Sequence, residues 1–195
     1  MNKPTNASLL PSLILLATIF CGLAACSSAP SSDLQQHYYV FDANPLPQVN
    51  RIPDNANVIE IRSVKLPRYL NGDQLVMQAK DHRFIKANYH SWADNLHAAI
   101  KRALINDINQ LEGKYFAVNS CENCKQLSVY IEHFYPSEEG LLLLSGYLAV
   151  TQPNGVSSIR HFYNKSQLRE AGYANAVKQM REQIRVLASE INQTP

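Results

Sequence analysis

The sequence predicts an α+β domain, in which a mostly antiparallel sheet packs against two long amphipathic helices in a sandwich-like arrangement. Short apolar runs with strand-like alternation, bounded by Pro, Gly and Asn, fill most of the chain. In two longer stretches, 96–111 and 168–191, apolar residues instead recur at three- and four-residue steps, which is the period of a helix. We therefore expect a single domain over residues 37–192.

The N-terminus is typical of an export signal. The first 25 residues carry one charged side chain, Lys3, ahead of an apolar run that is too short to span a bilayer. The run ends in Leu23-Ala24-Ala25-Cys26, which has the residue types and spacing of the bacterial lipobox. We expect residues 1–25 to be a signal peptide that is removed, and Cys26 to receive diacylglycerol. The alternative is an ordinary secretory signal that happens to precede a cysteine.

The lipid on Cys26 is the expected membrane anchor, and no other cofactor is expected. Each buried methylene contributes about 0.8 kcal/mol, so several acyl chains hold a protein firmly. Asp directly after the cysteine commonly retains enteric lipoproteins in the inner membrane, but this chain has Ser27. We therefore expect the periplasmic face of the outer membrane. Residues 26–36 are rich in Ser, Pro and Gln and are expected to act as a flexible tether.

Length and charge limit the function classes. Removing the signal leaves 170 residues, enough for one domain with a substantial core. Lys3 is the only charge removed, so 17 basic residues face 16 acidic ones. This balance has no basic excess, which argues against a nucleic-acid partner.

Strands are predicted through the first half of the domain. The segment His37–Phe41 is aromatic and β-branched, and Asn57–Lys65 is a strand-like apolar run. Two further strands, Gln74–Gln78 and Arg83–Tyr89, are separated by the polar stretch Ala79–His82, which suits a hairpin.

An amphipathic helix follows at Leu96–Leu111. We expect Ser91-Trp92-Ala93-Asp94 to open it as a variant of the capping box, and Gly113 to stop it. In that position Trp92 is expected to pack into the core.

The second half returns to strands. Segments 126–135, 141–150 and 156–163 are joined by turns at Pro136–Gly140 and Pro153–Gly155, which predicts an antiparallel meander whose middle strand is covered on both faces. A long amphipathic helix over 168–191 ends the chain. Its apolar stripe is interpreted as core packing, with a contact between subunits as the alternative.

No catalytic or metal-binding pattern stands out, so no catalytic residue and no metal site are expected. The chain has no Gly-rich phosphate loop or nucleophile elbow, and its six histidines lack ligand spacing. The adjacent Glu138 and Glu139 are expected at a solvated turn rather than as an acid–base pair.

Cys121-Glu-Asn-Cys124 is the one motif that could carry redox chemistry. Thioredoxin-type pairs lie at a helix N-terminus, where the helix dipole lowers the thiol pKa, whereas this pair leads into a predicted strand. We therefore interpret it as a structural disulfide that closes a tight loop. A thiol oxidoreductase is the alternative.

Five segments carry a resemblance to a known family. They are Val64–Leu70, Gln74–Gln78, Ala87–Leu96, Val129–Phe134 and Leu144–Tyr147. In this order behind a lipobox, they resemble the ABC-type transport auxiliary lipoprotein family over most of residues 37–190. Cys121 and Cys124 have no place in that pattern.

The resemblance implies a non-enzymatic subunit of an intermembrane transport system with lipids as its cargo. It implies two kinds of partner: other copies of the chain in a ring-like homo-oligomer, and an MCE-domain protein of the PqiB type that reaches across the periplasm from the inner membrane. It also implies a role in envelope integrity. Another envelope-assembly or lipid-carrier lipoprotein is the alternative. Within the resembling segments, Tyr69 follows Pro67 in a loop, and we expect it to contact a partner.

Overall fold

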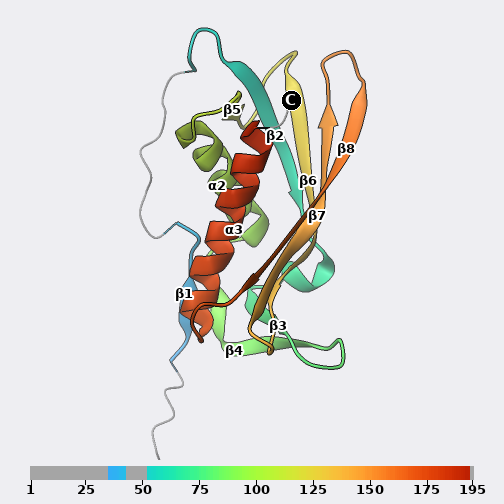
Figure 1. The fold of residues 1–195 in the computed structure, drawn as a ribbon. Helices are drawn as coiled ribbons and strands as arrows, with labels where there is room; N and C mark the ends of the chain where they lie inside the picture. Colours follow the sequence, from blue (N-terminus) through green and yellow to red (C-terminus); the bar gives the residue numbers. More distant parts are fainter. Residues whose placement is uncertain (1–34, 43–51, 194–195) are drawn as a thin grey trace, which may run out of the picture. The chain divides into compact units, whose positions relative to one another are not determined.

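The structure is a computed structural model that describes residues 35–42 and 52–193, all but the first of which belong to one compact unit, residues 36–195 (Figure 1). The signal peptide, the lipobox residues Leu23, Ala24 and Ala25, the lipidation site Cys26 and most of the tether lie outside the described residues. In the described part of the chain, no helix combines the length and apolar character needed to cross a bilayer.

A five-stranded sheet forms the centre of this unit, with the strand order β5-β2-β6-β7-β8. Its strands are β2 (Asn57–Lys65), β5 (Tyr115–Val118), β6 (Lys125–Pro136), β7 (Leu141–Thr151) and β8 (Ser157–Gln167). The predicted meander β6-β7-β8 is confirmed, and Gly140 and Gly155 take positive φ at its two turns. However, β2 pairs in parallel with both β5 and β6, so the sheet is mixed.

A second sheet has the order β1-β4-β3, with β1 (His37–Tyr39), β4 (Phe84–Trp92) and β3 (Gln74–Gln78). The predicted hairpin β3–β4 is confirmed. Its loop holds Asp81 and His82 at φ values of 63° and 60°, a left-handed conformation that Asp and His tolerate better than most residues. Strand β1 pairs in parallel with the far end of β4.

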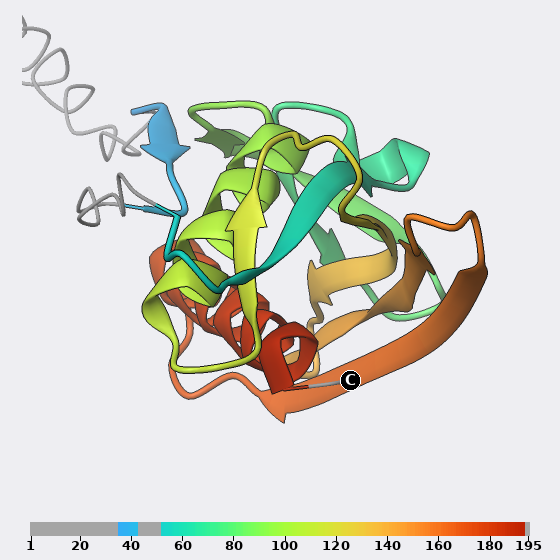
Figure 2. The same cartoon turned by 90° about the horizontal axis from the view of Figure 1, so that it is seen from above.

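Both helices, α2 (Leu96–Gln110) and α3 (Tyr173–Gln193), cover the same face of the five-stranded sheet (Figures 1 and 2). The α+β fold is therefore confirmed. The apolar stripe of α3 is core, as predicted, because its members pack on the sheet and on α2. These members are Val177, Met180, Ile184, Leu187 and Ile191, none of them more than 5% exposed.

The predicted start of α2 is wrong. Strand β4 runs through Ser91 and Trp92, and the N-cap is Asn95, whose side-chain oxygen accepts the backbone N–H of His97 at 3.1 Å. Trp92 pairs with Tyr39 of β1, and this pairing supplies hydrogen-bond partners for the backbone of β4. The strand is therefore favoured here over a local helix cap. Trp92 is nevertheless buried, with its ring stacked on Phe41 at 5.2 Å between centroids.

The end of α2 is held by a residue from the other helix. Asn192 of α3 donates its side-chain N–H groups to the carbonyls of Ile108 and Leu111, at 3.1 and 3.2 Å, and its side-chain oxygen accepts the N–H of Tyr115. A Cβ at Gly113 would lie 2.3 Å from the Asn192 side chain. Gly113 therefore makes room for this contact, just beyond the end of the helix at Gln110.

Helix α3 begins later than predicted, at Tyr173 rather than Leu168. Gln179 binds the preceding chain instead: its side-chain nitrogen donates to the carbonyl of Gln167 at 2.7 Å, and its oxygen accepts the N–H of Arg169 at 3.1 Å. These bonds satisfy backbone groups of residues 167 and 169, which therefore need no helical partners. The non-helical segment ends at Gly172, where φ is 101°.

Arg181 joins the two helices to the segment that follows β1. Its guanidinium donates two hydrogen bonds to Asp107 of α2, at 2.5 and 2.7 Å, and one to Asp42, at 2.8 Å. Burial opposes the charge of Arg181, but the bonds to Asp107 and Asp42 outweigh burial and raise the pKa of the guanidinium. Asp107 is only 3% exposed, so this is an interior ion pair.

Candidate functional site

The two faces of the five-stranded sheet differ sharply. The helix-facing side of β7 is buried at Leu142, Leu144 and Leu148, whereas Leu143 and Tyr147 on the other side are partly exposed. The prediction that the middle strand is covered on both faces is therefore wrong. The helices supply only one layer, and Tyr147 on the opposite face keeps part of its surface exposed.

An aromatic patch lies on this uncovered side. Tyr130 of β6 stacks on Tyr147 of β7 with 4.5 Å between ring centroids, and Tyr147 contacts His161 of β8 at 5.8 Å. Beside them, Ile159 and Tyr163 are 65% and 66% exposed. We call Tyr130, Tyr147, Ile159, His161 and Tyr163 the outer-face patch. Exposed aromatic residues of this kind are enriched where proteins bind each other.

Tyr69, the predicted partner contact, lies in the short 3-10 turn η1 (Arg68–Leu70). Its ring stacks on Phe84 at 4.3 Å between centroids. Its hydroxyl donates to the carbonyl of Glu132 at 3.1 Å and accepts the N–H of Phe134 at 3.4 Å, and burial raises its pKa to about 12. Through these contacts Tyr69 links η1 to β6 within the chain. Contact with a partner stays a prediction for this residue.

Cys121 and Cys124 are joined by a disulfide in the connection between β5 and β6, with their Cα atoms 6.0 Å apart. This connection crosses from one side of β2 to the other, because both β5 and β6 pair with β2. Among the described elements, the pair is followed directly by β6 and not by the first turn of a helix, the position that thioredoxin-type pairs occupy.

Among the described residues, one group has the composition of a metal site. The carboxylate of Glu60 and the two sulfurs of Cys121 and Cys124 lie within 4.8 Å of one another. While the disulfide stands, neither sulfur is a thiolate, the form that binds metals. Glu138 and Glu139 are exposed on the β6–β7 turn and form no acid–base pair with a buried group.

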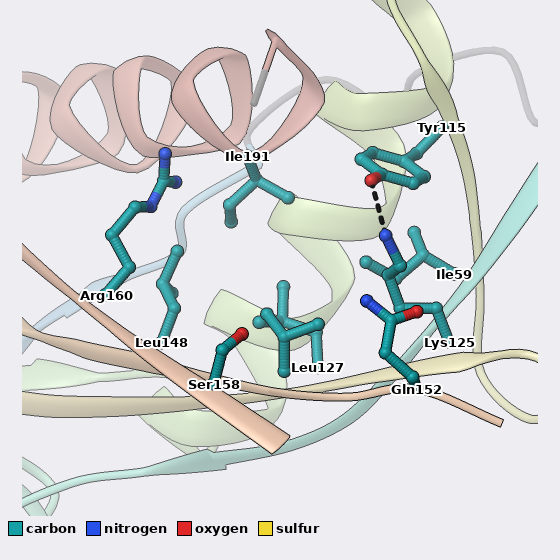
Figure 3. Close-up of a pocket in the computed structure, with 10 residues that line it drawn as sticks. Ile59, Tyr115, Lys125, Leu127, Leu148, Gln152, Ser158, Arg160 and Ile191 are labelled. Carbon is teal, nitrogen blue, oxygen red and sulfur yellow. Dashed lines mark hydrogen bonds between the residues drawn. The ribbon is translucent and has the colours of Figure 1, made fainter. Parts of the chain in front are cut away.

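A small cavity lies on the helix-facing side, at the C-terminal end of α3 (Figure 3). It measures about 140 Å³, and its lining residues come from all five strands of the sheet and from α3. The hydrophobic pattern did not predict this cavity, because one wall is Tyr115 of β5, a strand that the pattern also did not predict.

The sequence pattern does not predict the outer-face patch either. Its members belong to three strands, and only the register, with Tyr130 opposite Tyr147 and Tyr147 opposite His161, brings them together. A signal was present in β8, where Ile159, His161 and Tyr163 occupy alternate positions and so share one face.

Comparisons with known proteins agree on one family. Residues 39–192 match the ABC-type transport auxiliary lipoprotein component. The intermembrane transport lipoprotein PqiC of Escherichia coli (strain K12) is 24% identical over 136 residues, which cover 69% of this chain and 70% of that protein. PqiC of Shigella flexneri matches with the same values.

Two solved structures share the fold. The crystal structure of an uncharacterized protein superposes with a TM-score of 0.69 at 21% identity, covering 81% of this chain and 97% of that one. Protein XCC0632 from Xanthomonas campestris gives a TM-score of 0.62 at 11% identity, covering 79% and 91%. The family match spans nearly the whole described domain, from β1 to the end of α3, and the chain therefore belongs to the ABC-type transport auxiliary lipoprotein family.

Proposed function

We propose that this protein is a non-enzymatic subunit of an intermembrane lipid transport system. In this proposal it is held at the periplasmic face of the outer membrane by lipid on Cys26. There it receives the distal end of a periplasm-spanning MCE-domain protein of the PqiB type, and copies of the chain form a homo-oligomeric ring. The observation that carries the proposal is the family match over residues 39–192, supported by the likeness to an intermembrane transport lipoprotein.

The outer-face patch is the surface that we assign to the MCE-domain partner. Tyr147 lies at its centre, flanked by Tyr130 and His161 on the neighbouring strands. Aromatic side chains bury a large area at low cost in side-chain entropy, which is why they dominate the energetics of protein interfaces. The helices occupy the opposite side of the sheet, so the patch can be covered without rearranging the core.

Docking is tested by co-purification. The tagged chain is isolated from membranes after mild cross-linking, and MCE-domain proteins are sought by mass spectrometry. The double variant Tyr147→Ser/Tyr163→Ser should lose most of the captured partner. Val186→Ser removes an exposed apolar side chain from α3 and is the control, which should capture as much as the wild type. A double variant that captures the partner at the wild-type level would remove the patch from the proposal.

The anchor is tested separately by metabolic labelling with palmitate. Cys26→Ser should lose the label and no longer hold the domain at the membrane through lipid. Cys21→Ser removes the other N-terminal cysteine and should label like the wild type. Equal labelling of Cys26→Ser and the wild type would overturn the lipobox assignment without touching the docking surface.

A further inference from the structure

The cavity at the end of α3 has an apolar interior. Five aliphatic side chains line it: Ile59, Leu127, Leu148, Val150 and Ile191. Four of these are no more than 5% exposed, so the void reaches into the core and is more than a surface dent. Helix α3 ends at this cavity, and Ile191 of its last turns points into it (Figure 3). Apolar cavities of this size hold water poorly and accept small apolar groups.

The remaining lining residues are polar, and their charge has one sign. Arg160 and Ser158 lie on one side of the cavity, Lys125, Tyr115 and Gln152 lie on the other, and no carboxylate side chain is among the ten lining residues (Figure 3). The ammonium group of Lys125 donates to the neutral hydroxyl of Tyr115 at 2.7 Å and lies 4.8 Å from the centre of its ring. Arg160 donates to the main-chain carbonyl of Glu190 at 3.4 Å.

We propose that this cavity binds a small organic anion, namely a carboxylate that carries an apolar group of about six carbons. A cavity of about 150 Å³ lined by aliphatic side chains takes a ligand the size of benzene, which sets the size of the apolar group. The carboxylate lies at the mouth, where Lys125 provides a charge-assisted hydrogen bond and the Tyr115 and Ser158 hydroxyls provide further donors. Small-molecule sites usually combine an apolar lining with a small number of polar groups that orient the ligand.

This site goes beyond the proposed docking function and does not rest on it. The outer-face patch and the cavity lie on opposite sides of the same sheet, as the alternation of residues along β7 and β8 requires. Within β8, Ser158 and Arg160 face the helices, whereas Ile159 and His161 face outward. A variant at one site therefore leaves the other intact.

Photo-cross-linking tests the proposal on the full mature chain in lipid nanodiscs. The probe is a six-carbon carboxylate bearing a diazirine at its apolar end. Mass spectrometry should find the label on Leu148, Val150 or Ile191. Excess hexanoate should abolish it, whereas hexanol and hexylammonium, which lack the negative charge, should compete at least about tenfold less well.

Matched variants assign the two halves of the site. Lys125→Met keeps the length of the side chain and should weaken labelling about tenfold, whereas Lys165→Met, which removes an exposed lysine from the other face, should have no effect. Ser158→Phe fills the mouth from an exposed position and should block labelling, whereas Ser158→Ala should not.

Three results would overturn the proposal: label outside the cavity, equal competition by hexylammonium, or undiminished labelling of Ser158→Phe. The required chemistry could come from a fatty acid or from the C-terminal leucine of a polypeptide. Hexanoate and N-acetyl-leucine are therefore compared as competitors, and the stronger one identifies the source.

The co-purification of an MCE-domain protein should be unaffected by all of these variants, so failure of the cavity proposal is distinguishable from failure of the docking function.

Discussion

The inner and outer faces of the five-stranded sheet share the same strands but have opposite chemistry. The inner face is aliphatic and closed by α2 and α3, whereas the outer face is aromatic and polar and carries the patch centred on Tyr147. Packing alone explains the inner face. The outward-facing rings gain little from the fold of the single chain, and exposed apolar and aromatic patches of this kind are typical of binding surfaces.

The largest expected difference between the two faces is between two positions of β6. Phe134 is fully buried on the inner face and stacks on Phe41, so Phe134→Ala should cost about 3–5 kcal/mol of the free energy of unfolding. Tyr130→Ala on the outer face loses the contact with Tyr147 and should cost about 1 kcal/mol. Chemical unfolding of both variants measures the difference. Equal losses would mean that the outer face is also part of the stable core.

The second test compares a buried ion pair of the helix layer with an ion pair on the surface. Arg181→Met leaves the buried carboxylate of Asp107 without its partner and should cost about 3–5 kcal/mol. Arg102→Met breaks the pair with Asp94, in which both side chains are about half exposed, and should cost little. Thermal unfolding of the two variants measures this. Arg181→Met/Asp107→Leu should regain much of the loss, and failure to regain it would assign the effect to packing.

A smaller effect is expected from the disulfide. Cys121→Ser/Cys124→Ser opens a loop so short that the cross-link restricts the unfolded chain little, and stability should fall by about 2 kcal/mol or less. Unfolding with and without a reducing agent measures this. Capture of the MCE-domain partner should not change. A folded double variant without capture would contradict the structural interpretation and restore a redox role.

The smallest expected effect lies in the second sheet. Burial, and then the neighbouring His37, lower the pKa of His90, whose ring also stacks on Tyr173 and whose Nδ1 lies 2.8 Å from the Tyr39 hydroxyl. Because the folded state binds this proton less readily than the unfolded chain, stability is full above about pH 6.5 and falls below it. Unfolding at pH 7.5 and 5.5 should show a smaller pH dependence in His90→Gln than in the wild type or His161→Gln.

The sequence predicted the elements better than their connections. Period-two and period-3.6 patterns located the strands of the meander and both helices, because burial on one face imposes those periods. Strand direction has no such signature, so the parallel pairing of β2 was not foreseen. The start of α2 was misplaced for a related reason, because pairing of Trp92 with Tyr39 extends β4 past the expected cap. Asn192, which holds the end of α2, is 81 positions from Leu111 in the sequence.

Among the functional residues, the sequence located motifs that are contiguous and missed surfaces that are assembled. Cys121 and Cys124 are three positions apart in a recognisable spacing, and Tyr69 lies within a segment that resembles the family. The outer-face patch and the cavity each draw on several strands, and the cavity needs the short strand β5, whose four residues are too few for a periodic pattern.

The ion pair between Asp42 and Arg181 joins residues 139 positions apart, and β1 finds its partner β4 about 50 positions along the chain. Contacts of such high sequence separation close late, because the loop entropy must be offset first. If the chain is exported with its N-terminus leading, Asp42 emerges long before Arg181. The domain then cannot complete its fold until the last helix has left the translocation channel. This delay keeps the chain unfolded while it is exported.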